Sequence, residues 1–215
     1  MKYLIEIDDA GSGSLVGQTC IGVLRKETGK YLCGFIDLKY YQPESFKQKA
    51  YLREVINITK NIFEKLKVPK KEPIIICQGY IFDLLREWLT IQGYNWRSGK
   101  IEGLLQQKVE SSFASHAISL GLPENYIKYT RFPFHFHRLL KWVYADYKNR
   151  SNYCKKGWPS WQRYGYLHLD ISYGILRNYH YYCLKCGKKI LPKSEVKIIK
   201  YVSNRPTTLY LHKDC

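Results

Sequence analysis

Acidic side chains are scarce in the second half of this sequence. Only 5 of the 18 Asp and Glu residues lie in residues 111–215, against 18 of the 35 Lys and Arg residues, so this half carries a net charge of +13. A surplus of this size repels itself unless a polyanion neutralises it, which favours a nucleic-acid partner. The alternative is a solvated surface in a lysine-rich protein.

Long apolar runs are also missing. No stretch approaches the roughly 20 apolar residues that cross a bilayer. The first residues, MKYLIEIDD, reach an acid at Glu6 and lack the apolar core of a signal peptide. We therefore expect no membrane partner and a cytoplasmic location. The chain has no internal repeat, and its 45% apolar content over 215 residues predicts a globular protein with a sizeable core.

The order of the expected elements predicts an α/β fold whose mixed sheet is flanked by helices. Its sheet begins antiparallel, with a hairpin at 27–30, and continues with a parallel part. We expect a first domain in 1–175 and a small zinc-finger domain in 176–215. The expected elements are strands at 3–8, at two places within 15–41, at 72–79 and at 126–134; helices at 45–67, 80–92, 100–120 and 137–150; and a loop at 94–100.

Two cysteine-bearing pairs near the end of the sequence predict a metal site. Cys183-x-x-Cys186 and His212-x-x-Cys215 have the ligand types and spacing of a closed, structural zinc site. The spacing resembles that of a treble-clef zinc finger. Four unrelated residues or disulfides are the alternatives, and the expected cytoplasmic setting argues against disulfides. The other cysteines have no paired spacing and are expected to fill the core: Cys20, Cys33, Cys77 and Cys154.

Two adjacent carboxylates, Asp8 and Asp9, end the first expected strand in KYLIEIDDAGSGSLVG. A carboxylate near a buried strand is costly unless it is paired or holds a cation. Two-metal nucleases use clustered carboxylates to bind two Mg²⁺ or Mn²⁺ ions. The small residues Gly11, Ser12 and Gly13 that follow would let a phosphodiester backbone approach closely.

The stretch IEIDDAGSGSLVG resembles the first motif of type 2 ribonuclease H, in which an Asp-Glu pair is followed by Ala-Gly-x-Gly. Asp8 would match the Asp, Asp9 the Glu, and Ser12 replaces the usual Arg. The strand at 72–79 resembles the one that carries the second Asp of that family, but Cys77 and Gln78 stand there. Residues 141–161 resemble its late helix and Gly-aromatic-Pro segment. The resemblance implies a ribonuclease H-like fold and a nuclease that uses Mg²⁺ or Mn²⁺ to cut RNA–DNA hybrid or structured nucleic acid.

A third acidic ligand would have to come from elsewhere in the sequence. Glu102 and Asp146 are the main candidates, although Glu102 can instead favour a helix dipole and Asp146 can form a surface salt bridge. Asp170 is a weaker candidate. His135 and His137 flank Phe136, where either can shuttle a proton, pack against neighbours or contact phosphate.

Aromatic and basic residues are interleaved in residues 128–166, and the whole chain has 20 tyrosines. Rings of this kind stack on exposed bases while cations hold phosphates, although such rings can equally belong to the core. Arg131, Lys155 and Lys156 are candidate nucleic-acid contacts. Two alternatives to a nuclease stay open: a non-catalytic nucleic-acid-binding protein with a degenerate site, and an adaptor whose zinc finger binds protein.

Overall fold

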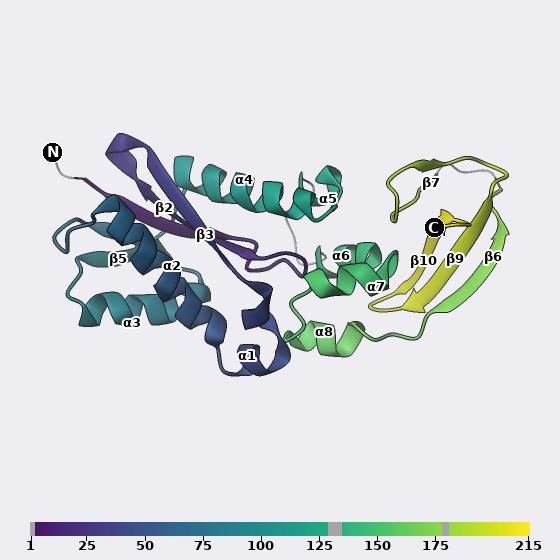
Figure 1. Ribbon diagram of the computed structural model, residues 1–215, viewed down its shortest axis with the longest axis horizontal. Coiled ribbons are helices and arrows are strands. Elements are labelled where there is room, and N and C mark those ends of the chain that lie inside the picture. Colours follow the sequence, from purple (N-terminus) through teal and green to yellow (C-terminus); the bar gives the residue numbers. More distant parts are fainter. Residues whose placement is uncertain (1–2, 129–134, 178–180) are drawn as a thin grey trace. The chain divides into compact units, whose positions relative to one another are not determined.

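The computed structural model describes residues 3–128, 135–177 and 181–215 (Figure 1). The chain divides into two compact units, Met1–Leu120 and Gly121–Cys215. This division differs from the expected domains, 1–175 and 176–215. The strand at Asp170–Ile175 hydrogen-bonds along its length to the strand at Glu195–Val202, and therefore belongs with the C-terminal residues.

The first unit contains a mixed five-stranded sheet with the order β3-β2-β1-β4-β5. The pairs β1–β2 and β2–β3 are antiparallel, whereas β1–β4 and β4–β5 are parallel. The expected mixed α/β fold, with its antiparallel start and parallel part, is confirmed. The strands are β1 (Ile5–Ala10), β2 (Thr19–Arg25), β3 (Lys30–Ile36), β4 (Ile74–Cys77) and β5 (Trp96–Gly99).

Helices cover both faces of this sheet (Figure 1). The main core lies between the sheet and helices α2 and α3, where alternate strand residues such as Ile5, Ile7 and Ile76 are fully buried. Helix α4 packs on the opposite face, against β1 and β2. The helices of this unit are α1 (Pro43–Lys47), α2 (Ala50–Leu66), α3 (Asp83–Ile91) and α4 (Leu104–Ser119), with 3₁₀ turns at Lys26–Thr28, Leu38–Tyr41 and Tyr80–Phe82.

Several sequence-based expectations about elements were wrong in part. The expected loop at 94–100 contains β5, a short edge strand whose polar Arg97 and Ser98 give no alternating pattern. The expected helix at 45–67 is broken at Lys49, which adopts a left-handed φ of 53°. In the expected strand at 126–134, residues 126–128 are helical, and the remainder lies outside the described residues.

The second unit combines short helices with two small sheets. Its larger sheet has the antiparallel order β10-β9-β6, and β7 pairs with β8. The expected helix at 137–150 is two helices, because the chain leaves helical geometry at Asp146. The elements are α5 (Glu124–Lys128), α6 (His135–Tyr144), α7 (Tyr147–Arg150), a 3₁₀ turn (Ser151–Tyr153), α8 (Pro159–Tyr164), β6 (Asp170–Ile175), β7 (Tyr181–Tyr182), β8 (Lys189–Ile190), β9 (Glu195–Val202) and β10 (Pro206–His212).

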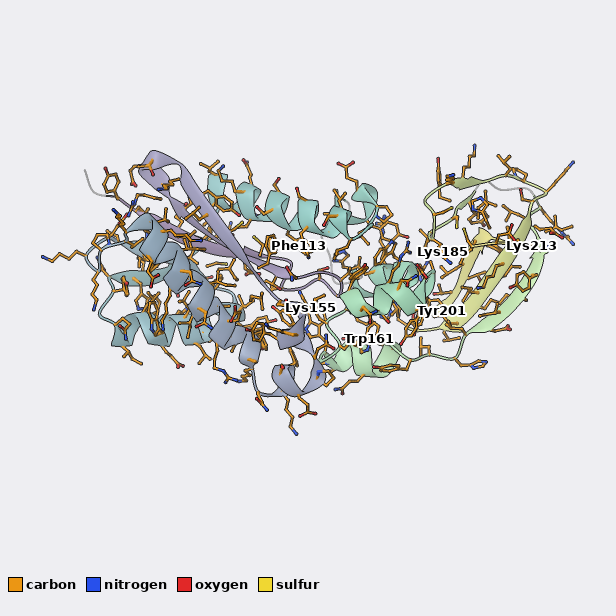
Figure 2. All side chains as sticks on the ribbon, viewed as in Figure 1. Phe113, Lys155, Trp161, Lys185, Tyr201 and Lys213 are labelled. Carbon is orange, nitrogen blue, oxygen red and sulfur yellow. The ribbon has the colours of Figure 1, made fainter. Side chains whose placement is uncertain are left out.

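Fully buried Trp142 and Trp161 are the largest apolar side chains of this second core, and Trp161 comes from α8 (Figure 2). Among the described residues, no helix combines the length and the apolar character that a membrane span requires.

Candidate metal centres

Asp8 lies on β1 and is a buried residue. Only 7% of the residue is exposed. Burial raises the pKa of Asp8 from 3.8 to about 6, with further upward contributions from the charges of Asp9 and Glu110. Hydrogen bonds from the Cys77 thiol and the Asp9 backbone N–H oppose this rise without cancelling it. The structure therefore places a carboxylate where its negative charge is poorly compensated.

Asp9 points to the opposite face of β1 from Asp8, as neighbours on a strand do. Its Oδ1 atom lies 3.6 Å from the position that a Cβ on Gly79 would take, just beyond the end of β4. The charges of both carboxylates help to raise the pKa of the Cys77 thiol to about 11, although burial is the largest cause. Both carboxylates therefore lie at the end of the parallel strand pair β1–β4.

Helix α4 runs alongside β1 in the same direction. Val109 lies against Gly22, the register partner of Asp8, where an added Cβ would come within 2.2 Å of the valine side chain. One turn later, Phe113 lies against Gly11, beyond the end of β1. The start of α4 is therefore near the start of β1, and its middle is level with Asp8.

This direction decides which glutamate of the α4 region lies near Asp8. Glu110 follows Val109, and its charge acts on the Asp8 carboxyl group. It is exposed and accepts a 3.0 Å hydrogen bond from Gln106. Glu102 lies before the first residue of α4, at the far end, where it pairs with Lys100. The structure thus brings Glu110, which the sequence analysis missed, near Asp8, and does not bring Glu102 there.

The small residues after the acids form a tight turn. The Ser14 N–H donates a 3.0 Å hydrogen bond to the Gly11 carbonyl, and Gly11 has a left-handed φ of 84°. A Cβ on Gly11 would come within 2.3 Å of the Phe113 ring, so the space beside Gly11 is filled by protein. Ser12 is half-buried, while Gly13 is exposed with no atom within 4 Å of its added Cβ. The room for a ligand is therefore at Gly13.

The remaining acidic candidates lie in the second unit. Asp146 stands between α6 and α7, where its two carboxylate oxygens accept hydrogen bonds of 3.1 and 3.0 Å from Asn149. Asp170 begins β6 and is exposed beside Lys200, its register partner on β9. Contacts within the second unit therefore explain where Asp146 and Asp170 lie.

The histidines on α6 have partly buried rings. Burial lowers the pKa of His135 and of His137, and nearby arginines lower both further. His137 packs edge-on against Tyr164, with ring centroids 4.9 Å apart. His135 Nε2 and His137 Nδ1 are buried without hydrogen-bond partners among the described residues. Lowered pKa values keep both rings neutral near pH 7, which favours packing over phosphate contact.

The candidate basic contacts have different surroundings. Lys155 is fully buried, and its Nζ lies 5.4 Å from the ring centroid of Trp158. Lys156 is half-buried. Arg131 lies outside the described residues. Of the two described lysines, Lys156 is thus the one whose side chain reaches solvent.

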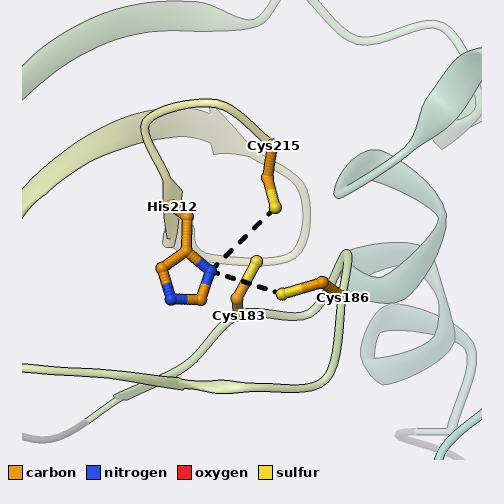
Figure 3. Close-up of side chains that lie close together, drawn as sticks. All are labelled: Cys183, Cys186, His212 and Cys215. Carbon is orange, nitrogen blue, oxygen red and sulfur yellow. Dashed lines mark hydrogen bonds between the residues drawn. The ribbon is translucent and has the colours of Figure 1, made fainter.

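Cys183, Cys186, His212 and Cys215 converge as the spacing predicted (Figure 3). Their ligand atoms all lie within 4.8 Å of one another. His212 turns Nδ1 toward the thiols, 3.3 Å from Cys186 Sγ and 4.0 Å from Cys215 Sγ. Three sulfurs and one imidazole nitrogen at such separations suit the tetrahedral geometry of zinc. This group can hold a zinc ion.

The backbone around this cluster is arranged for thiolates. Burial raises the pKa of Cys183, but backbone N–H groups of Cys186, His212 and Lys185 outweigh it and bring the value to about 7. The turn after Cys183 closes at Gly187, whose N–H donates to the Cys183 carbonyl at 2.8 Å and whose φ is 76°. The second ring nitrogen of His212 lies 3.3 Å from the Lys189 carbonyl, which orients the imidazole.

Arg150 of α7 ties the cysteine turn to the helices of the second unit. Its guanidinium donates hydrogen bonds of 2.7 and 2.8 Å to the carbonyls of Leu184 and Lys185, and another of 2.8 Å to the Trp142 carbonyl. It also stacks on the Trp142 ring, 4.1 Å from the centroid. Burial lowers the pKa of Arg150, but these contacts hold the cation in place. The turn that carries Cys183 and Cys186 is therefore held against the helices of this unit.

Within residues 3–128, 135–177 and 181–215, the cysteine–histidine cluster is the one group of three or more Cys, His, Asp or Glu residues whose ligand atoms are close enough to share an ion. Asp8 interacts with Asp9 and with Glu110, but the three acids do not form such a group. No protein-family model matches this chain, and a search of curated proteins finds no match. What the chain does must therefore be argued from these two sites.

Proposed function

We propose that this chain is a nuclease dependent on Mg²⁺ or Mn²⁺, with a ribonuclease H-like first unit and a zinc-stabilised basic second unit. The single observation that carries the proposal is the buried Asp8 carboxyl group, whose pKa is raised to about 6 beside two further acids. Buried carboxyl groups with a raised pKa are common where a protein binds a cation or transfers a proton. The strand order β3-β2-β1-β4-β5, with the acids ending the central strand, supports the fold assignment.

Asp8, Asp9 and Glu110 would hold the catalytic cations. All three offer carboxylate oxygens, the ligand type that Mg²⁺ and Mn²⁺ prefer, and a cation there would compensate the charge of Asp8. When bound, such ions supply activation of a water molecule and stabilisation of the leaving oxygen of a phosphodiester. The exposed Gly13 leaves space for the nucleic-acid backbone beside them.

The second unit would bind nucleic acid through its charge. Its 18 basic and 5 acidic side chains attract a polyanion, and half-buried Lys156 is a candidate phosphate contact. A structural zinc ion at Cys183, Cys186, His212 and Cys215 would stabilise this unit. The turn at Cys183 and the β9–β10 hairpin between the ligand pairs support a relationship to treble-clef zinc fingers.

A second function, nucleic-acid binding without cleavage, is favoured by one observation. Cys77 ends β4, beside Asp8, and its raised pKa keeps it a neutral thiol that donates a hydrogen bond to that carboxylate. A neutral thiol is a poor ligand for a hard cation. On this reading, the thiol of Cys77 occupies the place of a missing carboxylate, and the site has lost its activity.

A cleavage assay with four proteins separates the two functions. The parent chain, Asp8→Asn, Cys77→Asp and the control Glu44→Gln are incubated with labelled hybrid, duplex, branched and single-stranded substrates in Mn²⁺. Glu44 is exposed on α1, so its substitution removes one charge from the same unit away from the site. Cleavage by the parent and by Glu44→Gln, but not by Asp8→Asn, supports the nuclease.

Salt-dependent binding by all four proteins, with cleavage absent from the parent but gained by Cys77→Asp, supports the degenerate site. If the parent neither cleaves nor binds any of the substrates at low salt, both functions are wrong. The adaptor interpretation then becomes the stronger one, because it alone predicts no salt-sensitive binding.

A further inference from the structure

A second group of reactive side chains lies on the α4-covered face of the first unit, apart from the carboxylates. Cys20 of β2 and Cys33 of β3 project from the same face, because Cys33 pairs with Gly22, two residues along from Cys20. Each thiol shifts the pKa of the other, so the two sulfur atoms are near enough to interact. Cys33 is exposed, whereas Cys20 is fully buried. The pair therefore combines one thiol that solutes can reach with a second thiol that is buried.

Two hydroxyl groups complete the cluster. The Tyr31 hydroxyl lies 3.8 Å from Cys20 Sγ and 3.0 Å from Ser112 Oγ, and Ser112 Oγ lies 3.9 Å from Cys33 Sγ. The Tyr31 ring reaches this place because it lies over Gly22, where a Cβ would come within 2.9 Å of it. The Ser112 hydroxyl thus lies beside Cys33 and the Tyr31 hydroxyl beside Cys20, and either hydroxyl can donate a hydrogen bond to a sulfur anion.

These donors change the acidity of the two thiols in opposite directions. The hydrogen bond from Cys20 is the largest cause of a lowered pKa at Cys33, and Tyr31 and Ser112 lower it further, against the effect of burial. The pKa of Cys20 is raised because its thiol serves as donor and is buried. Thiolate character and exposure together make a cysteine susceptible to oxidation.

We propose that Cys33 and Cys20 form a reversible disulfide when the protein meets a hydroperoxide. The Cys33 thiolate attacks the outer peroxide oxygen, the O–O bond breaks, and Cys33 becomes a sulfenic acid. The leaving alkoxide or hydroxide takes a proton from solvent and departs as alcohol or water. The Cys20 sulfur then attacks the Cys33 sulfur, the S–O bond breaks, and water leaves with the Cys20 proton. The two thiols are oxidised by two electrons and the peroxide is reduced.

This inference does not depend on the proposed nuclease. It depends only on the register of β2 with β3 and on the position of Ser112 on α4. The resulting bond would link adjacent strands on the sheet face that also carries Asp8, the register partner of Gly22.

The test is peroxide oxidation of the full, zinc-loaded chain followed by peptide mapping. Hydrogen peroxide is added in small molar excess at pH 7, free thiols are blocked with N-ethylmaleimide, and the chain is digested with trypsin. Cleavage after Arg25, Lys26 and Lys30 separates the two cysteines. We expect a linked pair of peptides containing Cys20 and Cys33, lost on treatment with a thiol reductant, before Cys77 or Cys154 is modified.

Variants keep the inference falsifiable if one fails to fold. Cys33→Ser changes an exposed position and should abolish the linked peptide, whereas Cys20→Ser should leave Cys33 oxidised to sulfenic or sulfinic acid. Tyr31→Phe and Ser112→Ala should each slow the blocking of Cys33 by N-ethylmaleimide several-fold. Oxidation of Cys33 no faster than Cys77, or a sulfinic acid at Cys33 in the parent with Cys20 still reduced, would overturn the proposal.

Discussion

The buried Asp8 carboxyl group should make the metal-free protein less stable as pH rises. Its pKa of about 6 in the folded chain exceeds the ordinary value of 3.8. Below pH 3.8 the group is protonated in both the folded and unfolded states and costs nothing. Between pH 3.8 and 6 the unfolded chain releases the proton first, so stability falls; above pH 6 the loss is complete.

The magnitude follows from the size of the shift. A difference of roughly two units in pKa corresponds to about 3 kcal/mol in the free energy of unfolding, at 1.36 kcal/mol per unit. Asp8→Asn removes the charge and keeps an oxygen that can accept the hydrogen bond from Cys77. We therefore expect Asp8→Asn to stabilise the first unit by about 3 kcal/mol at pH 8 and by about half as much at pH 5.

Thermal unfolding of metal-free protein measures this effect. For a unit of 120 residues, about 3 kcal/mol corresponds to roughly a 10 °C rise in Tm at pH 8. Glu44→Gln is the matched control, since it removes one charge from an exposed side chain of the same unit. Adding Mn²⁺ should raise the Tm of the parent toward that of Asp8→Asn and leave the variant unchanged. An Asp8→Asn variant that is no more stable than the parent at pH 8 refutes the reasoning.

Three further predictions concern packing and the zinc cluster. Gly22→Ala should destabilise the first unit by about 1–3 kcal/mol in urea unfolding, because its Cβ would come within 2.2 Å of Val109. In the double variant with Val109→Ala, part of this lost stability should be recovered. If the free-energy changes of the two substitutions simply add, the contact is not the cause. Arg150→Lys should speed the loss of zinc to a chelating dye about 10-fold or more, because a compact ammonium cannot reproduce the planar, forked guanidinium that reaches three carbonyls. Unchanged release contradicts this role. Chelation or Cys186→Ser should abolish amide protection in β9 and β10 while β1 stays protected, as followed by hydrogen exchange; loss of protection in both units would show that they unfold together.

Local patterns in the sequence were sufficient for two features. Apolar alternation and turn residues predicted the first four strands of the mixed sheet, because such patterns express burial of one or both strand faces directly. The spacing of Cys183, Cys186, His212 and Cys215 predicted their cluster, because a pair of ligands two residues apart on a tight turn already faces one point. In both cases, the residues that determine the feature are close together in the sequence or recur at one short spacing.

Only the tertiary structure decided which side chains from different elements meet. Glu102 and Glu110 are both glutamates of the α4 region, and the direction of α4 along β1 places Glu110 beside Asp8 and leaves Glu102 with Lys100. Strand β5 has no pattern of its own, since its order comes from backbone bonds to β4. The contact between Cys20 and Cys33 depends on the register of β2 with β3, which no spacing of cysteines reveals. These features depend on helix direction and strand register, which are set by packing across the whole unit.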